Sequence, residues 1–532
     1  MVTESSASFL GLDLSTQQLK AVIVNENLEI LHEETVIFET HLPEYRTNGG
    51  VRVNKANPHE ITAPTIMWIK ALDLLMDKLI IASVDFSKIA AISGTAQQHG
   101  SVYWQNGAEK TLGNLDSSNF LHTQLATSFS VSDSPTWMDS TTKIECRCFE
   151  EAVGGPENLA RITGSRAYER FTGPQIARIS THRPETFKNS ERISLVSSFL
   201  ASLFLGRIAP IDYSDASGMN LMDLRTKKWH PQLLKLCGPD IEKKLGDPVP
   251  SCSCLGTISP YFVERYGFNE KCKVIACSGD NPSSLIGMGI KDDWLAVSLG
   301  TSDTLLIWLS EPKTVLNGHI LCNPLDPNAY MAILCFKNGS LAREKIRNRY
   351  ADKSWDEFNE LLESTPRGNF GYLGLHFDVE EILIAASGEF RYNKEGKKLS
   401  KFSSSEIEIR AAIEGQFLLR RLFAEEIGFK IGKGTKILAT GGASCNKSIL
   451  QVLSDVFGCP VYTQDNVNSA LIGAAKQALI GFNKERGENN RADYLTPKLV
   501  CEPYKNSEDM YGPMVQKLVQ IVKNIENESK QI

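Results

Sequence analysis

The chain begins with a hydrophobic pattern that contains one unexpected acid. In FLGLDLSTQQLKAVIV, residues 9–24, two apolar runs are joined by a short polar turn. This pattern predicts a β-hairpin. Asp13 falls inside the first apolar run, although Asp is depleted in strands and an unpaired buried carboxylate is costly. Either Asp13 caps its own turn or its carboxylate serves a ligand.

The same pattern returns in the second half of the chain. WLAVSLGTSDTLLIWL, residues 294–309, aligns with the first hairpin so that Thr301 matches Thr16 and Ser298 matches Asp13. We therefore expect a duplicated architecture in which each half opens with the same strand-turn-strand unit. Because the second copy has no acid at the matching position, we infer that the hairpin itself does not require Asp13.

Apolar strands followed by Gly-containing turns recur along the chain. The segments KIAAISGTAQQHG (88–100), KVIACSGDNPSSLIGMG (273–289) and KILATGGASCNKSILQVL (436–453) have this form, and a helix follows in the last two. Strands that alternate with helices predict an α/β fold. At 532 residues the chain is too long for one core, and we expect two lobes, residues 1–290 and 291–532.

Composition then narrows the class of protein. The hydrophobic content is 42%, the charged content 23% and the formal net charge −6, which is typical of a globular protein and gives no sign of nucleic-acid binding. We find no basic-then-apolar leader, and the apolar stretch 194–206 is short for a membrane span, so we expect a buried helix there. The twelve cysteines include no C-x-x-C pair and are expected to be reduced thiols in the cytoplasm.

The turns of the two hairpins are candidate phosphate-binding loops. Their backbone N–H groups and hydroxyls, including those of Thr16 and Thr301, can wrap a polyphosphate, and Gly300 permits close approach of the backbone. A carboxylate present in only one copy fits a single metal ion beside the phosphates, held by Asp13 directly or through water.

Two further turns carry candidates after predicted strands. Asp280 in SGDNPSS lies at or next to a helix N-terminus, where an ionised carboxylate is stabilised and can accept the proton of a substrate hydroxyl; a plain helix cap is the alternative. Gly441 and Gly442 in TGGASCN would let a nucleotide lie against the backbone, with Asn446 as a hydrogen-bonding partner. A tight turn that needs positive φ is the competing interpretation.

The remaining candidates are single polar or aromatic residues in loops. Gln97, Gln98 and His99 follow a predicted strand and together form a hydrogen-bonding wall that suits a polyol, although a lone histidine is more often structural. Arg170 in YERFTG and Asp139 in WMDS can add hydroxyl contacts, although loop residues of these types are usually solvated. Trp355 in SWDEFNELL opens a predicted helix, where core packing is the alternative to a ligand contact.

An ordered set of segments over nearly the whole chain resembles the FGGY family of carbohydrate kinases and, within it, the xylulose kinases of eukaryotes. The segments are GLDLSTQQLK, SGTAQQHGSVYW, WMDSTT, TGSRAYERFTGPQIA, PIDYSDASGMNL, SGDNPSSLIGM, AVSLGTSDTL, CFKNGSLAREKIR and LATGGASCN. The resemblance implies two actin-like, ribonuclease-H-like lobes with MgATP between them and a sugar deep in the cleft. It also implies transfer of the ATP γ-phosphoryl group to D-xylulose, which gives D-xylulose 5-phosphate and ADP.

The resemblance gives each candidate a role. Asp280 matches the general base that activates the terminal hydroxyl of the ketose, and Asp13 matches the carboxylate near Mg²⁺ and the ATP phosphates. The positions that match the sugar site are His99, Arg170, Asp280 and Asn281, to which we add Gln98 and Asp139. The positions that match the adenosine site are Trp355, Gly441, Gly442 and Asn446, and those in the phosphate loops are Thr16, Gly300 and Thr301. In these roles the lobe 1–290 binds sugar and the lobe 291–532 binds the nucleotide.

Two alternatives stay open. A sibling kinase acting on ribulose, gluconate or glycerol would share the ATP side and differ around His99 and Arg170. An ATP-driven conformational module of the actin or chaperone type would use the same lobes to move a partner and would hydrolyse ATP without sugar. If the chain is a D-xylulose kinase, the expected partners are a small sugar and ATP, with neither nucleic acid nor a membrane.

Overall fold

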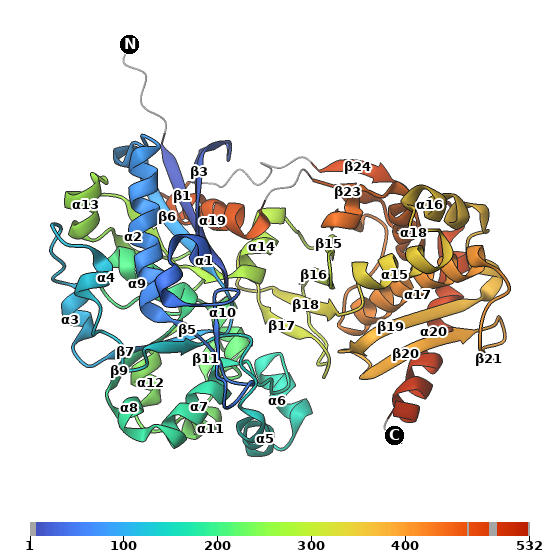
Figure 1. Ribbon diagram of the computed structural model, residues 1–532, viewed down its shortest axis with the longest axis horizontal. Helices are drawn as coiled ribbons and strands as arrows, with labels where there is room; N and C mark the ends of the chain where they lie inside the picture. Colours follow the sequence, from blue (N-terminus) through green and yellow to red (C-terminus); the bar gives the residue numbers. More distant parts are fainter. Residues whose placement is uncertain (1–6, 465–467, 489–496, 530–532) are drawn as a thin grey trace, which may run out of the picture. The chain divides into compact units, whose positions relative to one another are not determined.

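The computed structural model describes residues 7–464, 468–488 and 497–529, which form two compact units (Figure 1). The first unit holds the chain up to Gly289, and it also includes residues 320–329 and the segment that begins at Asn468. The second unit begins at Ile290 and holds the other described residues. The N-terminal stretch that was searched for a leader lies partly outside the described residues.

The β-strands make one large sheet in each unit and several small ones. The strands before residue 290 are β1 (Ser8–Leu14), β2 (Gln18–Asn25), β3 (Ile30–Ile37), β4 (Arg52–Val53), β5 (Ile61–Pro64), β6 (Ile89–Ala96), β7 (Ser101–Gln105), β8 (Asp133–Pro135), β9 (Ser190–Leu195), β10 (Met222–Asp223), β11 (Lys228–Trp229), β12 (Cys254–Thr257), β13 (Lys273–Ile275) and β14 (Ser278–Gly279). The later strands are β15 (Trp294–Leu299), β16 (Asp303–Leu309), β17 (His319–Cys322), β18 (Tyr330–Phe336), β19 (Leu373–Glu381), β20 (Ala386–Tyr392), β21 (Lys398–Leu399), β22 (Lys436–Thr440), β23 (Val461–Thr463) and β24 (Lys498–Cys501).

Helices flank these sheets. Those before residue 290 are α1 (Phe38–His41), α2 (Thr65–Ile81), α3 (Ala108–Leu112), α4 (Leu121–Gln124), α5 (Lys143–Ala152), α6 (Pro156–Thr163), α7 (Thr172–His182), α8 (Pro184–Lys188), α9 (Val196–Leu205), α10 (Tyr213–Ala216), α11 (Pro231–Leu234), α12 (Ile241–Leu245), α13 (Pro260–Tyr266) and α14 (Asp280–Met288). The later ones are α15 (Ser340–Tyr350), α16 (Trp355–Ser364), α17 (Ser405–Glu426), α18 (Lys447–Phe457), α19 (Ser469–Glu485) and α20 (Ser507–Ser529). Short 3₁₀ helices are η1 (Pro43–Tyr45), η2 (Phe86–Lys88), η3 (Ser217–Met219), η4 (Lys235–Cys237), η5 (Asn369–Gly371) and η6 (Gly442–Cys445).

The two large sheets repeat the same arrangement of strands. The order is β12-β13-β6-β1-β2-β3 in one sheet, with β14 also paired to β6, and β24-β23-β22-β15-β16-β18 in the other, with β17 added beside β18. Strand β1 is antiparallel to β2 and parallel to β6, and β15 is likewise antiparallel to β16 and parallel to β22. The predicted α/β fold, the two hairpins and their duplication are therefore confirmed, with each hairpin at the centre of its sheet.

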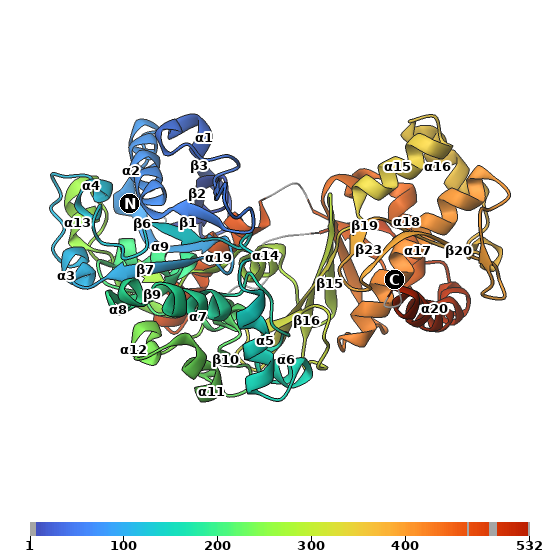
Figure 2. The ribbon, with the colours of Figure 1, turned by 60° about the horizontal axis from the view of Figure 1, so that its bottom comes forward.

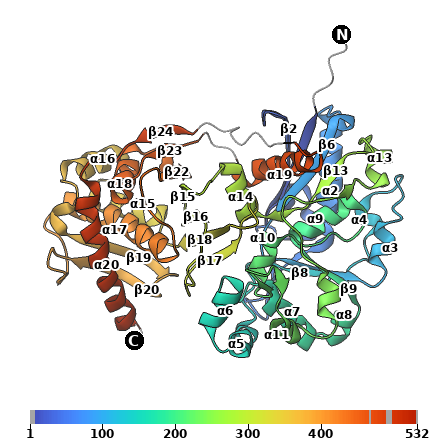
Figure 3. The same cartoon turned by 180° about the vertical axis from the view of Figure 1, so that it is seen from behind.

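Alternation along β1 decides where its acid points. The even-numbered leucines of β1 join the core that α2 and α9 form with the sheet. The other face of the sheet is covered by α19 (Figure 3). On this face of β1 the Phe9 ring lies 5.6 Å from the Phe482 ring, and a Cβ on Gly11 would come 2.6 Å from the backbone nitrogen of Ala475. Because successive side chains of a strand point to opposite faces, Asp13 lies on the α19 face.

Two expectations about apolar segments and cysteines can be compared with the fold. The stretch 194–206 covers the end of β9 and all of α9, whose residues are all buried, so the predicted buried helix is confirmed. Of the helices in the described ranges, none has the combination of length and apolar character needed to cross a membrane. None of the twelve cysteines forms a disulfide bond.

The second unit is organised around α17. Most of this helix is buried, and it packs against β19, α18 and α20 (Figure 2). Strand β22 leads through η6 into α18, as the pattern of residues 436–453 predicts. The turn after β22 is thereby placed beside the end of β15, to which β22 is paired.

Candidate active site

Three strands of the first sheet, β1, β6 and β14, end side by side. Asp13 on β1 and Ser278 on β14 both pair with Thr95 of β6. Asp280 follows β14 directly as the first residue of α14, and the cap of α19, Asn468, donates a hydrogen bond to Asp13. Two carboxylates therefore gather at the N-terminal ends of two helices, where the exposed N–H groups and the helix dipoles favour negative charge.

The Asp13 carboxylate is buried, with only 5% of the residue exposed. Burial raises its pKa, while hydrogen bonds from Ser15 and Asn468 and the charge of Lys20 act in the opposite direction. Because the net effect is a raised pKa, these neighbours offset only part of the cost of burying the charge. A positive charge beside the carboxylate would offset more of this cost.

The carboxyl group of Asp280 is suited to proton exchange near neutral pH. Burial raises its pKa to about 7, and the charges of Asp13 and Asp215 act in the same direction. Asn281 holds one oxygen, Oδ1, through its backbone nitrogen at 2.8 Å and its side-chain Nδ2 at 2.9 Å. A general base works best when its pKa lies near the working pH, and Asp280 meets this condition.

Asn281 links Asp280 to the side chains of Gln98 and Asp215. Its Nδ2 also donates to Gln98 Oε1 at 2.8 Å, and Gln98 Nε2 lies 3.3 Å from Asp215 Oδ1. Nearby, Asp212 caps α10 and accepts a 2.9 Å hydrogen bond from Ser278. The segment PIDYSDASGMNL contributed to the family resemblance, but neither acid was assigned a role. Two acids three residues apart in an otherwise apolar and small-residue stretch were the available signal.

His99 and Arg170 lie together, as a shared sugar site requires. His99 Nδ1 is 2.9 Å from the carbonyl oxygen of Gly218, and a carbonyl only accepts, so Nδ1 carries the proton and Nε2 is a free acceptor. Burial lowers the pKa of His99 to about 3, with the charge of Arg170 as a second cause, so the ring stays neutral. The His99 ring stacks on Phe171 at 4.5 Å, and the Arg170 guanidinium lies 5.6 Å from the same ring.

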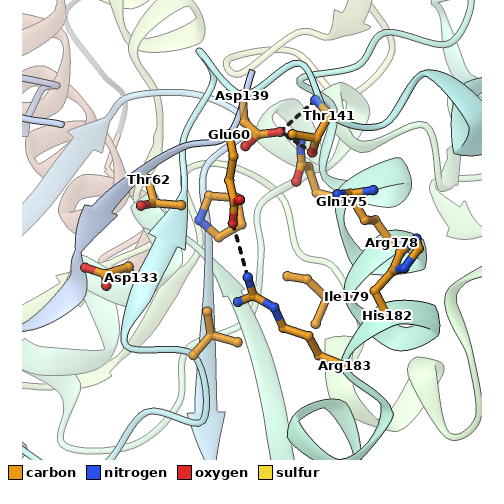
Figure 4. A pocket seen from close by; sticks show the side chains of 12 residues that line it. Glu60, Thr62, Asp133, Asp139, Thr141, Gln175, Arg178, Ile179, His182 and Arg183 are labelled. Carbon is orange, nitrogen blue, oxygen red and sulfur yellow. Dashed lines mark hydrogen bonds and ion pairs between the residues drawn. The ribbon is translucent and has the colours of Figure 1, made fainter. Parts of the chain in front are cut away.

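Asp139 has a different environment. It lines a cavity of about 250 Å³ (Figure 4). Its carboxylate accepts hydrogen bonds from the backbone nitrogens of Ile61 and Thr141, from the Thr141 hydroxyl at 2.6 Å and from Gln175 Nε2 at 2.7 Å. These four donors tie the loop after β8 to β5 and α7. A direct contact between Asp139 and sugar stays a prediction.

The loop that contains Asp139 also reaches the first phosphate-loop candidate. The indole Nε1 of Trp137 donates to Thr16 Oγ1 at 2.9 Å. Trp137 is 44% exposed, which is unusual for so large an apolar ring. Nothing in the sequence distinguishes this Trp from one that packs in the core.

In the second unit, the candidate turns lie at the ends of β15 and β22. The turn with Gly300 and Thr301 joins β15 to β16. Gly441 has φ +83°, and a Cβ there would come 2.7 Å from the carbonyl oxygen of Leu299, so the tight-turn interpretation is confirmed at this position. A Cβ on Gly442 would meet nothing within 4 Å. The packing around Gly442 therefore does not explain the second glycine.

Asn446 and Trp355 are brought onto neighbouring elements. Asn446 caps α18, and its Nδ2 donates to Asn359 Oδ1 at 2.8 Å. Asn359 lies one helical turn after Trp355, so both are on the same face of α16. The Trp355 ring lies 5.2 Å from Phe358 and 4.6 Å from the Arg347 guanidinium, and it is only half-buried. The predicted packing on Phe358 is present, and part of the ring remains accessible to a ligand.

Comparison with known proteins gives matches over most of the chain. The N-terminal domain of the FGGY family of carbohydrate kinases matches residues 130–287, and the C-terminal domain of that family matches residues 295–482. The chain is 54% identical to xylulose kinase of Mus musculus over 89% of this chain and 86% of the relative. It is 50% identical to xylulose kinase of Rattus norvegicus over 97% of this chain and 96% of the relative.

Solved structures show that the fold is shared more widely. Xylulose kinase from Rhodospirillum rubrum superposes with a TM-score of 0.80 at 14% identity, covering 98% of this chain and all of that chain. Plasmodium falciparum glycerol kinase with ADP superposes with a TM-score of 0.73 at 16% identity, covering 98% of each chain. At such low identities these superpositions establish the two-lobe, actin-like fold and nothing further. Together with the two domain matches and the high identity to the rodent proteins, they lead to one conclusion: the chain belongs to the FGGY family of carbohydrate kinases.

Proposed function

We propose that the chain is an ATP-dependent kinase that transfers the γ-phosphoryl group of ATP to D-xylulose, giving D-xylulose 5-phosphate and ADP. The observation that carries the proposal is identity of 50–54% to proteins named xylulose kinase over nearly the full chain. The site geometry supports the same chemistry, because phosphoryl transfer requires a positioned acceptor hydroxyl, a base and groups that offset phosphate charge.

Asp280 acts as the general base. With a pKa of about 7, its carboxylate can take the proton of the sugar's terminal hydroxyl as the oxygen bonds to the γ-phosphorus. Both hydrogen bonds from Asn281 go to Oδ1, so we assign the proton transfer to Oδ2. Asn281 thereby fixes the direction in which the base faces.

The sugar is held by His99, Arg170, Gln98 and Asn281. Because His99 is neutral and its Nδ1 is occupied by Gly218, its Nε2 accepts a hydrogen bond from a sugar hydroxyl. Arg170 supplies donors beside it. Asp139, whose four hydrogen bonds organise the adjoining loop, supports this site through the backbone.

The residues around Asp13 fit a magnesium ion. Two carboxylates lie near enough for the charge of Asp13 to raise the pKa of Asp280, and carboxylate oxygens are ligands that Mg²⁺ prefers. We assign Asp13 to hold the ion, directly or through water. When bound, Mg²⁺ neutralises phosphate charge that would otherwise oppose attack by the sugar oxygen.

The nucleotide is bound by residues of both hairpin turns and of the second unit. We assign the phosphates to the turns that contain Thr16, Gly300 and Thr301. We assign the adenosine to Gly441, Gly442, Asn446 and Trp355, which the accessible Trp355 ring and the free space at Gly442 support. In this scheme residues 1–290 bind the sugar and supply the base, and residues 291–532 bind the nucleotide. The twelve cysteines without a disulfide support a cytoplasmic location.

A sibling kinase for another polyol is the second candidate function. The fold does not separate the two, since a gluconate kinase from Lactobacillus acidophilus also superposes with a TM-score of 0.77 at 18% identity. Substrate choice therefore depends on side chains around His99 and Arg170. Family membership favours either kinase over a conformational module that hydrolyses ATP to move a partner.

One assay distinguishes these functions. The purified chain is given saturating MgATP and a panel of D-xylulose, D-ribulose, gluconate and glycerol, and ADP release is followed with a coupled enzyme. We expect the highest kcat/KM with D-xylulose and little ADP without sugar. A preference for another sugar overturns the substrate assignment, and equal ADP release without sugar overturns the kinase assignment.

A further inference from the structure

One buried segment forms hydrogen bonds to two of the residues proposed to bind sugar, Gln98 and His99. Residues 212–219 form α10 and η3. From this segment Asp215 accepts a hydrogen bond from Gln98, and the Gly218 carbonyl accepts one from His99. Neither Asp215 nor Gly218 is among the residues assigned above to sugar, nucleotide or metal.

The contacts around Asp215 fix the orientation of the Gln98 amide. Asp215 is buried, with Ser197 Oγ donating to Oδ2 at 2.5 Å and Gln98 Nε2 donating to Oδ1 at 3.3 Å. With its nitrogen held by the carboxylate, Gln98 presents its oxygen to Asn281 Nδ2, 2.8 Å away. The remaining hydrogen of that Nδ2 points to Asp280 Oδ1 at 2.9 Å. Along the row Asp215–Gln98–Asn281–Asp280 every donor faces an acceptor, so the two amide groups have only one orientation that satisfies all these hydrogen bonds.

Packing leaves these groups little freedom to rearrange. A Cβ on Gly279, the residue before Asp280, would come 2.3 Å from Gln98 Cγ and 2.7 Å from Asp215 Oδ1. The backbone that leads into the base is therefore pressed against the Gln98–Asp215 pair. A shift of either side chain would be transmitted to Asp280.

We propose that Asp215 is a positioning residue that acts through Gln98 and Asn281 to set the orientation of the base Asp280 and of the sugar. This inference rests on the proposed function of Asp280 as the base. The competing explanation is that Asp215 only stabilises the fold of residues 212–219. The two explanations differ in which kinetic constants change when the carboxylate is removed.

Asp215→Asn is the first test, because it keeps the shape of the side chain. The new amide can turn its nitrogen toward Gln98, which then turns its own nitrogen toward Asn281 and creates two facing donors. We expect kcat/KM for D-xylulose to fall about tenfold to a hundredfold, the size of effect expected from a small misplacement of reacting groups. The KM for ATP should change less than about twofold, since the nucleotide contacts assigned above do not include this row.

A matched control removes the other hydrogen bond to the same carboxylate. Ser197→Ala deletes the donor to Asp215 Oδ2 and leaves the Gln98–Asn281–Asp280 row intact. We expect its kcat/KM for D-xylulose to stay within about threefold of the wild type, because the hydrogen bond that is lost lies outside the row. Equal losses in Ser197→Ala and Asp215→Asn, or a loss of ATP binding as large as the loss with sugar, overturn the proposal in favour of a structural role.

Gln98→Met is an independent test of the row, and it can be used even if Asp215→Asn does not fold. Met fills a similar volume but can neither donate nor accept, so we expect it to reproduce the fall in kcat/KM with sugar. The double variant Asp215→Asn, Gln98→Met should have a kcat/KM no lower than that of the more impaired single variant, because both substitutions break the same row of hydrogen bonds. Additive losses, or normal kinetics of Gln98→Met, overturn the proposal. Absence of sugar-dependent turnover in the wild type would instead overturn the proposed function, which the same assay shows directly.

Discussion

The two matched hairpins each contain a buried carboxylate, with very different partners. Asp13 near the end of β1 has hydroxyl and amide neighbours, and the described residues place no guanidinium against it. Asp303 at the start of β16 is fully buried and is held by two arginines. Arg343 forms two parallel hydrogen bonds of 2.9 Å to it, and Arg420 lies at 2.7 Å.

The difference teaches how an acid that the fold neutralises is distinguished from one whose charge the fold leaves only partly compensated. A carboxylate neutralised by two guanidinium groups has its charge and its lone pairs satisfied within the fold. Asp13 keeps a raised pKa because its neighbours do not fully offset burial. The four predictions below test this contrast, beginning with the carboxylate beside Asp13.

The largest effect is expected for Asp280→Asn. Loss of the base should reduce kcat by about 10²–10⁴-fold while sugar and ATP still bind. The native pKa of about 7 lies above the ordinary 3.8, so the folded chain holds a proton that the unfolded chain has lost between these values. The stability that the folded chain gains from protonated Asp280 is full below about pH 4 and is lost as the pH rises through 7. At pH 8 the amide should therefore not lower the melting temperature, and near-normal turnover would refute the role of Asp280.

Asp303→Asn should have the largest effect on stability. It removes the charged carboxylate to which two buried guanidinium groups bind, and breaking a buried ion pair costs about 3–5 kcal/mol. Denaturant unfolding measures the change in the free energy of unfolding. The control is Lys398→Ala, which breaks the exposed pair with Glu528 and should cost less than about 1 kcal/mol. Similar losses in the two variants would show that the Asp303 cluster is not structural.

Asp13→Asn should lower activity and leave stability unchanged, whereas Asp303→Asn should lower stability. We expect kcat to fall about a hundredfold, the scale at which electrostatic support of phosphoryl transfer is lost, with no fall in melting temperature. Ser298→Ala changes the matching position of the second hairpin and should leave both properties close to wild type. A melted Asp13→Asn protein would return Asp13 to a structural role.

The smallest effect concerns pH. In the wild type, kcat/KM for sugar should rise with pH and level off above about 7, as Asp280 loses its proton. In Asp13→Asn the inflection should move to lower pH, because the negative charge that raises the pKa of Asp280 is gone. Rates measured between pH 5.5 and 9 would detect the shift. An unchanged inflection would mean that the two carboxylates do not interact in the working enzyme.

Much of the architecture was predictable because local pattern and tertiary fold agree. The alternation of apolar runs and turns predicted both hairpins, their duplication and the turn after β22. The buried helix α9 followed from its composition. Asp13 and Asp280 were identifiable because an acid in an apolar run, or directly after a strand, needs a specific reason to be there.

The supporting residues were not predictable in the same way. Asp215 becomes significant only because α10 places it against Gln98, more than a hundred residues earlier in the chain. Trp137 likewise contacts Thr16 across a similar separation. The assignment of α19 to the first unit also depends on packing, where it covers the face of β1 that contains Asp13.

The sequence by itself determined the hairpins, the duplicated α/β plan and the acids that chemistry needs, because hydrophobic period and turn residues act over a few neighbours. Only the tertiary structure decided which acid is neutralised by arginines and which is not. Asp13 and Asp303 lie in similar local patterns, but two distant arginines reach Asp303 and none of the described ones reaches Asp13. Charge compensation acts through space, so it appears only when segments far apart in the chain are brought together.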